Sequence, residues 1–208
     1  MIRGLREILP DNGKAFSSIL ISLKTRNFRL YFTGMCVSLT GTWMQQIAMS
    51  WLVYRLTGSV FLLATVTFMA QIPILLVTPL MSVFVDRFDR QKILILTQSL
   101  SMVQALSMAV LTLSGVIEVW HILILSLLIG CINALDNPTR QAFYPSLVAK
   151  EHLSNAIALN SAVINGSRLI GPAVGGVLIG IFGEGLCFLL NGISYLGVII
   201  ALSLMRLS

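Results

Sequence analysis

The chain has 208 residues, of which 56% are hydrophobic and 11% are charged, and its formal net charge is +6. Soluble domains contain about 45–50% apolar and about 25% charged residues, so this composition excludes an ordinary water-soluble domain. The three cysteines, Cys36, Cys131 and Cys187, are odd in number and fall in apolar segments, which argues against a disulfide framework.

Six apolar segments follow one another along the chain, each long enough as a helix to cross hydrocarbon about 30 Å thick. They do not alternate apolar and polar residues as barrel strands do, so we expect helices. After a cytoplasmic N-terminal segment at residues 1–28, residues 29–208 are predicted to form one bundle. Its spans are expected at about residues 31–52, 60–85, 93–113, 119–135, 156–182 and 186–204.

Prolines modify two of these predicted spans. Pro73 and Pro79 are expected to bend the second span. The sequence Asp136-Asn137-Pro138 is expected to form a turn that ends the fourth span, before a further helical piece at residues 139–148.

The basic residues are distributed unevenly between the two sides of such a bundle. With the N-terminus in the cytoplasm, 12 of the 14 fall on the cytoplasmic side, namely Arg3, Arg6, Lys14, Lys24, Arg26, Arg29, Arg87, Arg90, Lys92, Arg140, Lys150 and Arg206. Arg55 then faces outside, and Arg168 lies within a span. This bias predicts a multi-pass plasma (inner) membrane protein with both termini in the cytoplasm. No basic patch interleaved with aromatic residues points to nucleic acid.

The internal loop at residues 82–92 carries Asp86, Arg87, Arg90 and Lys92. Asp86 and Arg90 are four residues apart, which puts an acid and a base on the same side of a helical turn. Such an acid can also accept from the N–H groups at the start of a facing helix and lock two bundles together. The alternative is a solvated turn whose charges follow the topology rule.

The fifth span contains Gly171, Pro172, Gly175 and Gly176. Gly171 and Gly175 are four residues apart, as are Gly176 and Gly180, and such pairs allow helices to approach closely. Pro172 frees a backbone carbonyl and favours a bend. The pattern predicts a helix that shifts against a neighbour, with static packing as the alternative.

Arg168 lies near the middle of the same span, where an arginine costs about 2.5–3.5 kcal/mol on insertion scales. We therefore expect its side chain to face the bundle interior or a cavity. One interpretation is contact with a substrate or an anion, or a role in gating, with Asn133 and Asn165 as further candidate substrate-binding residues. The other is a buried arginine held by Asn133, Asn165 or a carbonyl of a broken helix.

The first span carries Gln45 and Gln46 beside Trp43. Two amides on one membrane helix cannot both face lipid. Together with the neighbouring tryptophan and methionines they are candidates for an adaptable substrate pocket. Hydrogen bonds between helices are the alternative.

Three features resemble the major facilitator superfamily of transporters. The loop at residues 82–92 resembles the motif between its second and third helices, with Ser82 and Asp89 in place of two glycines, and residues 171–176 resemble the core of its antiporter motif. Residues 27–32, 41–46 and 136–143 resemble the enterobactin-exporter-like, drug-efflux-like branch. The resemblance implies an all-α fold of six transmembrane helices, built as a 3+3 inverted repeat and forming the N-terminal half of a twelve-helix protein.

The same resemblance implies a secondary transporter that exports small molecules, such as siderophores or drugs, by alternating access. Its partners would be the lipid bilayer, a small-molecule substrate and a C-terminal six-helix half. Asp136 is the acidic candidate for proton coupling, although a cytoplasmic latch with Arg90 or Arg140 is its expected role.

Enzymatic activity is not expected, and neither a catalytic residue, a metal nor a cofactor is predicted. The sequence contains no HExxH, phosphate-loop or CxxC motif, and His121 and His152 both fall at span ends. Two alternatives to a transporter half stay open. One is a non-transporting membrane scaffold or fragment, and the other is the membrane domain of another exporter class.

Overall fold

The computed structural model describes residues 21–85 and 87–205, so the predictions for residues 1–20, Asp86 and Arg206 lie outside the described residues. The described part is helical and contains no strand, as expected from the sequence. The long helices are α2 (Arg26–Thr57), α3 (Val60–Val85), α4 (Arg90–Leu113), α5 (Val119–Phe143), α6 (Leu153–Phe182) and α7 (Glu184–Ser203). Short 3-10 turns are η2 (Ile21–Lys24), η3 (Tyr144–Ser146) and η4 (Lys150–His152).

Five of the described helices, α3 to α7, are long and apolar enough to cross a membrane. Helix α2 has 32 residues but is not among them, because threonines and the amides of Gln45 and Gln46 interrupt its apolar sequence. The assignment of α2 as a sixth span therefore stays a prediction.

The turn predicted at Asp136-Asn137-Pro138 is wrong, because α5 continues through these residues to Phe143. Pro138 removes one backbone N–H donor from the helix. Side chains reinforce the same turn, since Thr139 Oγ1 donates to the Leu135 carbonyl over 2.6 Å and Arg140 pairs with Asp136. The predicted piece at residues 139–148 is the end of α5 followed by η3.

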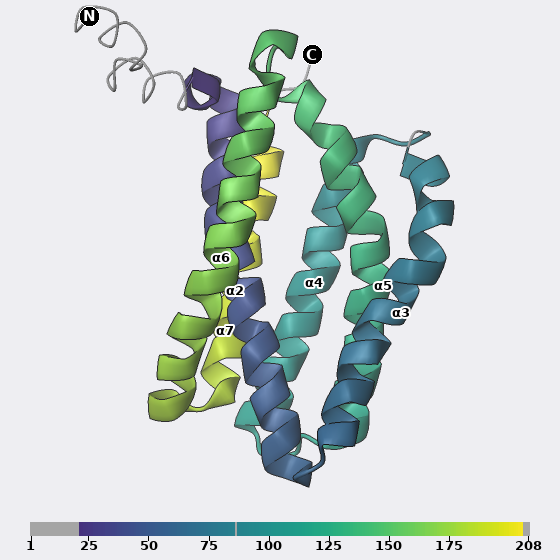
Figure 1. Cartoon of the computed structure of the whole chain (residues 1–208), viewed down its shortest axis with the longest axis vertical. Coiled ribbons are helices and arrows are strands. Elements are labelled where there is room, and N and C mark those ends of the chain that lie inside the picture. Colours follow the sequence, from purple (N-terminus) through teal and green to yellow (C-terminus); the bar gives the residue numbers. More distant parts are fainter. Residues whose placement is uncertain (1–20, 86, 206–208) are drawn as a thin grey trace, which may run out of the picture.

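The helices pack in a definite set of pairs (Figure 1). Helix α2 packs against α6 and α7, α3 packs along α5, and α4 packs against α5 and α7. The α2–α3, α4–α5 and α6–α7 turns lie together at the lower end of the bundle in Figure 1, whereas α2, α4 and α6 begin at the upper end.

Glycines allow two of these pairs to cross at short range. A Cβ on Gly130 of α5 would lie 2.5 Å from the Ala70 carbonyl oxygen of α3. A Cβ on Gly41 of α2 would lie 2.5 Å from Asn191 Oδ1 of α7. Both contacts are closer than any side chain permits, so these crossings depend on the missing methyl group.

The buried side chains form two apolar clusters with polar residues between them. One cluster contains Phe28, Tyr31 and Leu94, and the other contains Leu52, Met108 and other residues nearer the opposite end. Along α4, the buried polar side chains Thr97, Gln98, Ser101 and Gln104 fall between Leu94 and Met108. Each of these is paired inside the bundle or lines its cavity, so the polar layer lies at mid-depth.

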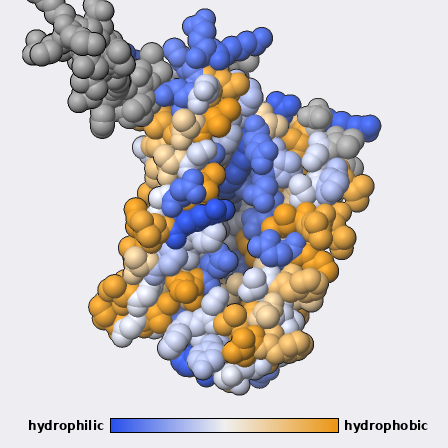
Figure 2. Space-filling view, viewed as in Figure 1, coloured by the Kyte–Doolittle hydropathy of each residue, from blue (hydrophilic) through white to orange (hydrophobic). Residues whose placement is uncertain are grey.

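The outer surface is largely apolar, unlike the surface of a soluble protein. Large apolar side chains are exposed along every long helix. Figure 2 shows hydrophobic residues over both flanks and hydrophilic residues along a furrow over α4, α5 and α6. Lipid around the flanks would solvate this surface, whereas water would not.

Candidate functional site

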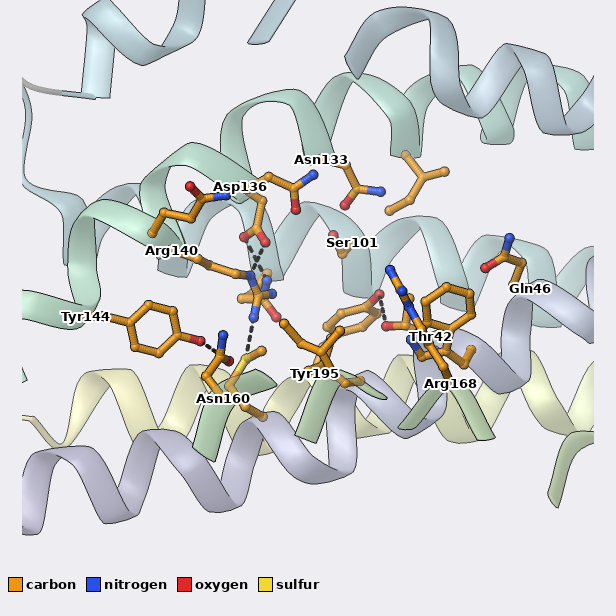
Figure 3. Close-up of a pocket in the computed structure, with 18 residues that line it drawn as sticks. Thr42, Gln46, Ser101, Asn133, Asp136, Arg140, Tyr144, Asn160, Arg168 and Tyr195 are labelled. Carbon is orange, nitrogen blue, oxygen red and sulfur yellow. Dashed lines mark hydrogen bonds and ion pairs between the residues drawn. The ribbon is translucent and has the colours of Figure 1, made fainter. Parts of the chain in front are cut away.

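A cavity of about 430 Å³ lies in the polar layer, lined by residues of α2, α4, α5, α6 and α7 and by Tyr144 of η3. Its size is that of a small-molecule site. Much of its wall can donate or accept hydrogen bonds, through Thr42, Gln46, Ser101, Asn133, Asn137, Gln141, Asn160 and Tyr195 (Figure 3). A polar chamber inside an apolar bundle is costly unless polar groups or solutes occupy it.

Asp136 and Arg140 form the charged end of this cavity (Figure 3). The buried Asp136 carboxylate accepts from Arg140 Nε at one oxygen. Its other oxygen accepts from Thr97 Oγ1 over 2.6 Å and from Gln98 Nε2 over 3.0 Å. Arg140 also contacts Met35 Sδ through Nη1. The negative charge of Asp136 is therefore fully compensated by its own neighbours.

The predicted loop residues at the upper end take different roles. Arg90 donates from Nη1 to the Ala142 carbonyl over 3.1 Å, so it anchors the end of α5, and the ion pair of Asp136 is with Arg140. Arg87 and Lys92 are exposed. Asp89, which sequence reasoning did not assign, caps α4 by accepting from the backbone N–H groups of Gln91 (2.9 Å) and Lys92 (3.4 Å).

Arg168 projects into the cavity at the end away from Asp136, close to Gln46 (Figure 3). Its guanidinium carbon lies 5.1 Å from the centroid of the Trp43 ring, within the range of a cation–π contact. Asn133 lines the same cavity, whereas Asn165 donates to the Ser161 carbonyl over 2.8 Å and does not line it. The structure thus brings Trp43, Arg168 and Asn133 together and leaves Asn165 outside.

The adjacent amides of Gln45 and Gln46 separate. Gln45 is buried, where its Nε2 donates to Gln104 Oε1 over 3.1 Å and its Oε1 accepts from Asn191 Nδ2 over 2.7 Å. Gln45 therefore ties α2 to α4 and α7, as the hydrogen-bonding alternative predicts. Gln46 is exposed and lines the cavity.

The glycines of α6 also divide into two kinds. A Cβ on Gly171 would lie 2.5 Å from Trp43 Cβ and 2.8 Å from the Thr40 carbonyl oxygen, and one on Gly175 would lie 2.8 Å from Ile47 Cγ2. These two positions permit close packing on α2. A Cβ on Gly176 would meet nothing within 4 Å. Pro172 stands inside α6, which continues to Phe182.

Several cavity residues were not expected from the sequence. Tyr144 bonds to Asn160 across the start of α6, and Tyr195 Oη lies 3.4 Å from Thr42 Oγ1. Tyr144 belongs to a turn and Tyr195 to the last helix, so the sequence gives no local sign that they share a wall. The one feature of the sequence that could have indicated Tyr144 and Tyr195 is that each is a polar side chain near or within an apolar segment.

These features together define a polytopic membrane protein whose central chamber suits a polar or amphipathic solute. The profile of the family described as "Transmembrane secretion effector" matches residues 17–208, and the chain belongs to this family of the major facilitator superfamily. The family is one of membrane transport proteins and not of enzymes. Membership also decides against the membrane domain of another exporter class.

Curated relatives are similar over most of this chain. The staphyloferrin A transporter of Staphylococcus aureus is 31% identical over 168 residues, which cover 80% of this chain and 42% of that protein. The macrolide efflux protein A of Streptococcus pyogenes is 28% identical (74% and 39% covered), and the multidrug efflux pump Tap of Mycolicibacterium fortuitum is 25% identical (77% and 41% covered). The chain thus spans about two fifths of their length. No solved structure is significantly similar to it.

Proposed function

We propose that the chain is the N-terminal six-helix half of a secondary transporter that exports small molecules by alternating access. The observation that carries the proposal is the polar cavity of about 430 Å³ at mid-depth of an apolar bundle. The relatives are named for a siderophore, for macrolides and for multiple drugs, so compounds of these classes are the candidate substrates. A C-terminal half would cover the open side of the cavity.

The helix pairing supports a 3+3 inverted repeat, in which α2, α3 and α4 correspond to α5, α6 and α7. Replacing each helix by its counterpart in the other triplet turns the α3–α5 pair into the α6–α2 pair. It likewise turns the α4–α5 pair into the α7–α2 pair. All four of these pairs are in contact in the structure. The α4–α7 pair converts into itself. Under this proposal α2 is a span equivalent to α5, and residues 29–208 form one bundle.

Charge supports an orientation with both termini in the cytoplasm. Arg26, Arg90 and Lys150 stand at the starts of α2, α4 and η4, at the upper end in Figure 1. At the opposite end, Arg55 is paired with Glu184. This asymmetry follows the positive-inside rule, which puts the upper end in the cytoplasm.

Alternating access would use the charged end of the cavity as a cytoplasmic latch. The Asp136–Arg140 pair lies within α5, and Asp136 also ties α5 to Thr97 and Gln98 of α4. Rearrangement of this cluster would free α5 at the end where Arg90 also holds it. Coupling to protons through protonation of Asp136, which would break the pair and loosen the cluster, is our proposal. The exposed Arg87 and Lys92 would take part with Asp86 in contacts between the halves, and the close packing at Gly171 and Gly175 would let α6 slide on α2.

Export in efflux-deficient bacteria that express the chain together with the C-terminal half of the staphyloferrin A transporter tests the proposal. Cells are loaded with fluorescent drugs and, separately, with a labelled siderophore, and loss of each compound is followed over time. We expect faster loss with both halves than with the C-terminal half alone, and slower loss when the chain carries Gln46→Leu, which changes the cavity wall. Lys150→Gln, at an exposed position outside the cavity, serves as the control. If no compound leaves faster with both halves than with the C-terminal half alone, the chain is a non-transporting scaffold or fragment.

A further inference from the structure

The cavity has an unbalanced charge. Three of its lining residues are charged, Asp136, Arg140 and Arg168. The first two neutralise each other, and Thr97 and Gln98 both donate to the second oxygen of Asp136. Arg168 adds a positive charge that no carboxylate of the described cavity wall offsets, so a ligand in this chamber meets a surplus cation.

The guanidinium of Arg168 lies beside one aromatic ring of the cavity wall. Its central carbon is over the Trp43 ring, 5.1 Å from the centroid, and the side chain is otherwise exposed at the open side of the cavity. Among the residues that the structure describes, none accepts a hydrogen bond from it, so its N–H edge is left for a ligand. A planar edge with parallel N–H donors matches the two oxygens of a carboxylate, which a flexible ammonium does not.

We propose that this cavity selects ligands that carry a carboxylate, which the edge of Arg168 binds in a two-point contact. The body of the ligand then lies against Trp43, while Gln46 and Asn133 offer further hydrogen bonds (Figure 3). Cationic ligands gain little here, because Asp136 already has three partners. The inference rests on the proposed function only in taking this cavity as the substrate site.

A matched pair of probes tests the inference on the full chain in phosphatidylcholine nanodiscs. The chain has three tryptophans, so Trp51→Phe with Trp120→Phe leaves Trp43 as the sole reporter beside Arg168. Pyrenebutyrate and pyrenebutyramide share one body and differ in the carboxylate. Both quench tryptophan by energy transfer when bound. We expect the acid to bind at least about tenfold more tightly than the amide, as a charge-assisted two-point contact predicts.

Substitutions of Arg168 assign the preference to this residue. Arg168→Gln is expected to bring the acid and the amide within about twofold of each other, and Arg168→Lys to keep part of the preference as a point charge. Arg29→Gln changes an exposed arginine of α2 outside the cavity and is expected to leave the ratio unchanged.

Three results would overturn the inference: equal binding of acid and amide, a preference that survives Arg168→Gln, or no quenching of Trp43 by either probe. If an Arg168 variant does not fold, the inference is still tested by comparing the binding of the acid and of the amide to the chain that retains Arg168. Selective binding without export in cells would leave this inference standing and remove the proposed function. Export without selectivity for the carboxylate would support the proposed function and overturn this inference.

Discussion

Arg55 and Glu184 form a two-point ion pair that joins the end of α2 to the start of α7. The distances are 2.8 Å between Nε and Oε1 and 3.2 Å between Nη2 and Oε2. The partners differ in exposure, since the Glu184 side chain is 7% exposed and the Arg55 side chain 52%. Loss of the arginine therefore strands a buried carboxylate, whereas loss of the carboxylate frees a cation that water can solvate.

From this asymmetry we expect Arg55→Gln to destabilise the protein more than Glu184→Gln. A stranded buried acceptor costs about 1–3 kcal/mol, whereas an exposed ion pair contributes about 0–1 kcal/mol. Thermal unfolding in detergent, followed by size-exclusion chromatography, measures both variants. A larger loss for Glu184→Gln would show that burial of Glu184 does not govern the pair.

The neighbouring amides of α2 give a second, matched comparison. Gln45→Leu removes the partner of both Gln104 and Asn191, so we expect a loss of about 1–3 kcal/mol in the free energy of unfolding. Gln46→Leu changes a cavity wall and is expected to shift the stability by less than about 0.5 kcal/mol. Equal thermal midpoints for the two variants would contradict the hydrogen-bond network.

The glycines of α6 make a third prediction. Gly171→Ala is expected to lower the thermal midpoint, because its methyl group would collide with Trp43 Cβ and the Thr40 carbonyl oxygen of α2. Gly176→Ala meets open space and is expected to be neutral or to stabilise by about 0.5–1 kcal/mol, since alanine restricts the unfolded chain. If both substitutions behave alike, α6 does not pack on α2 through Gly171.

The proposed cytoplasmic latch at Asp136 and Arg140 predicts that its loss changes the accessibility of the cavity from the two sides of the membrane. In a background without native cysteines, Gln46→Cys places a thiol in the cavity, and an impermeant maleimide reports its labelling in right-side-out and inside-out vesicles. Adding Asp136→Asn with Arg140→Gln removes both charges of the pair and avoids an unpaired one. We expect the ratio of the two labelling rates to change severalfold. An unchanged ratio refutes the latch.

Orientation can be read from intact cells in the same cysteine-free background. Val116 lies in the turn between α4 and α5, and Lys150 begins η4 at the other end of the bundle, and both are exposed. Under the proposed topology, Val116→Cys reacts with an impermeant maleimide from outside and Lys150→Cys reacts only after permeabilisation. The opposite pattern would invert the assignment of the two ends.

Composition and apolar run length were enough to predict a helical membrane bundle, because only helices and closed barrels satisfy their backbone in lipid and these segments do not alternate as barrel strands do. The cost of an arginine at mid-depth likewise predicted that Arg168 faces the bundle interior or a cavity, and the structure places it on the cavity wall with an exposed side chain. The continuation of α5 through Pro138 was missed, since the side-chain contacts of Thr139 and Arg140 outweigh the local signal of proline.

Which amide of α2 serves the bundle and which faces the cavity could not be predicted. Gln45 and Gln46 differ by about 100° around the helix, and the choice depends on where α4 and α7 place Gln104 and Asn191. The wall made by Tyr144 and Asn160 has the same origin, because the packing of η3 beside α6 brings the two together.

The bond between Asn191 and Gln45 also bears on biogenesis, because its partners are 146 positions apart in the chain. At a synthesis rate of about 5–20 residues per second, Asn191 follows Gln45 by roughly 7–30 seconds. During that interval α2 has emerged, but Asn191, the hydrogen-bond partner of Gln45, has not. Helix α2 is also the long helix whose composition does not identify it as a span. If α2 is the sixth span, as proposed, its stable insertion in the bilayer depends on the arrival of α7, and insertases or chaperones would have to protect the nascent chain until then.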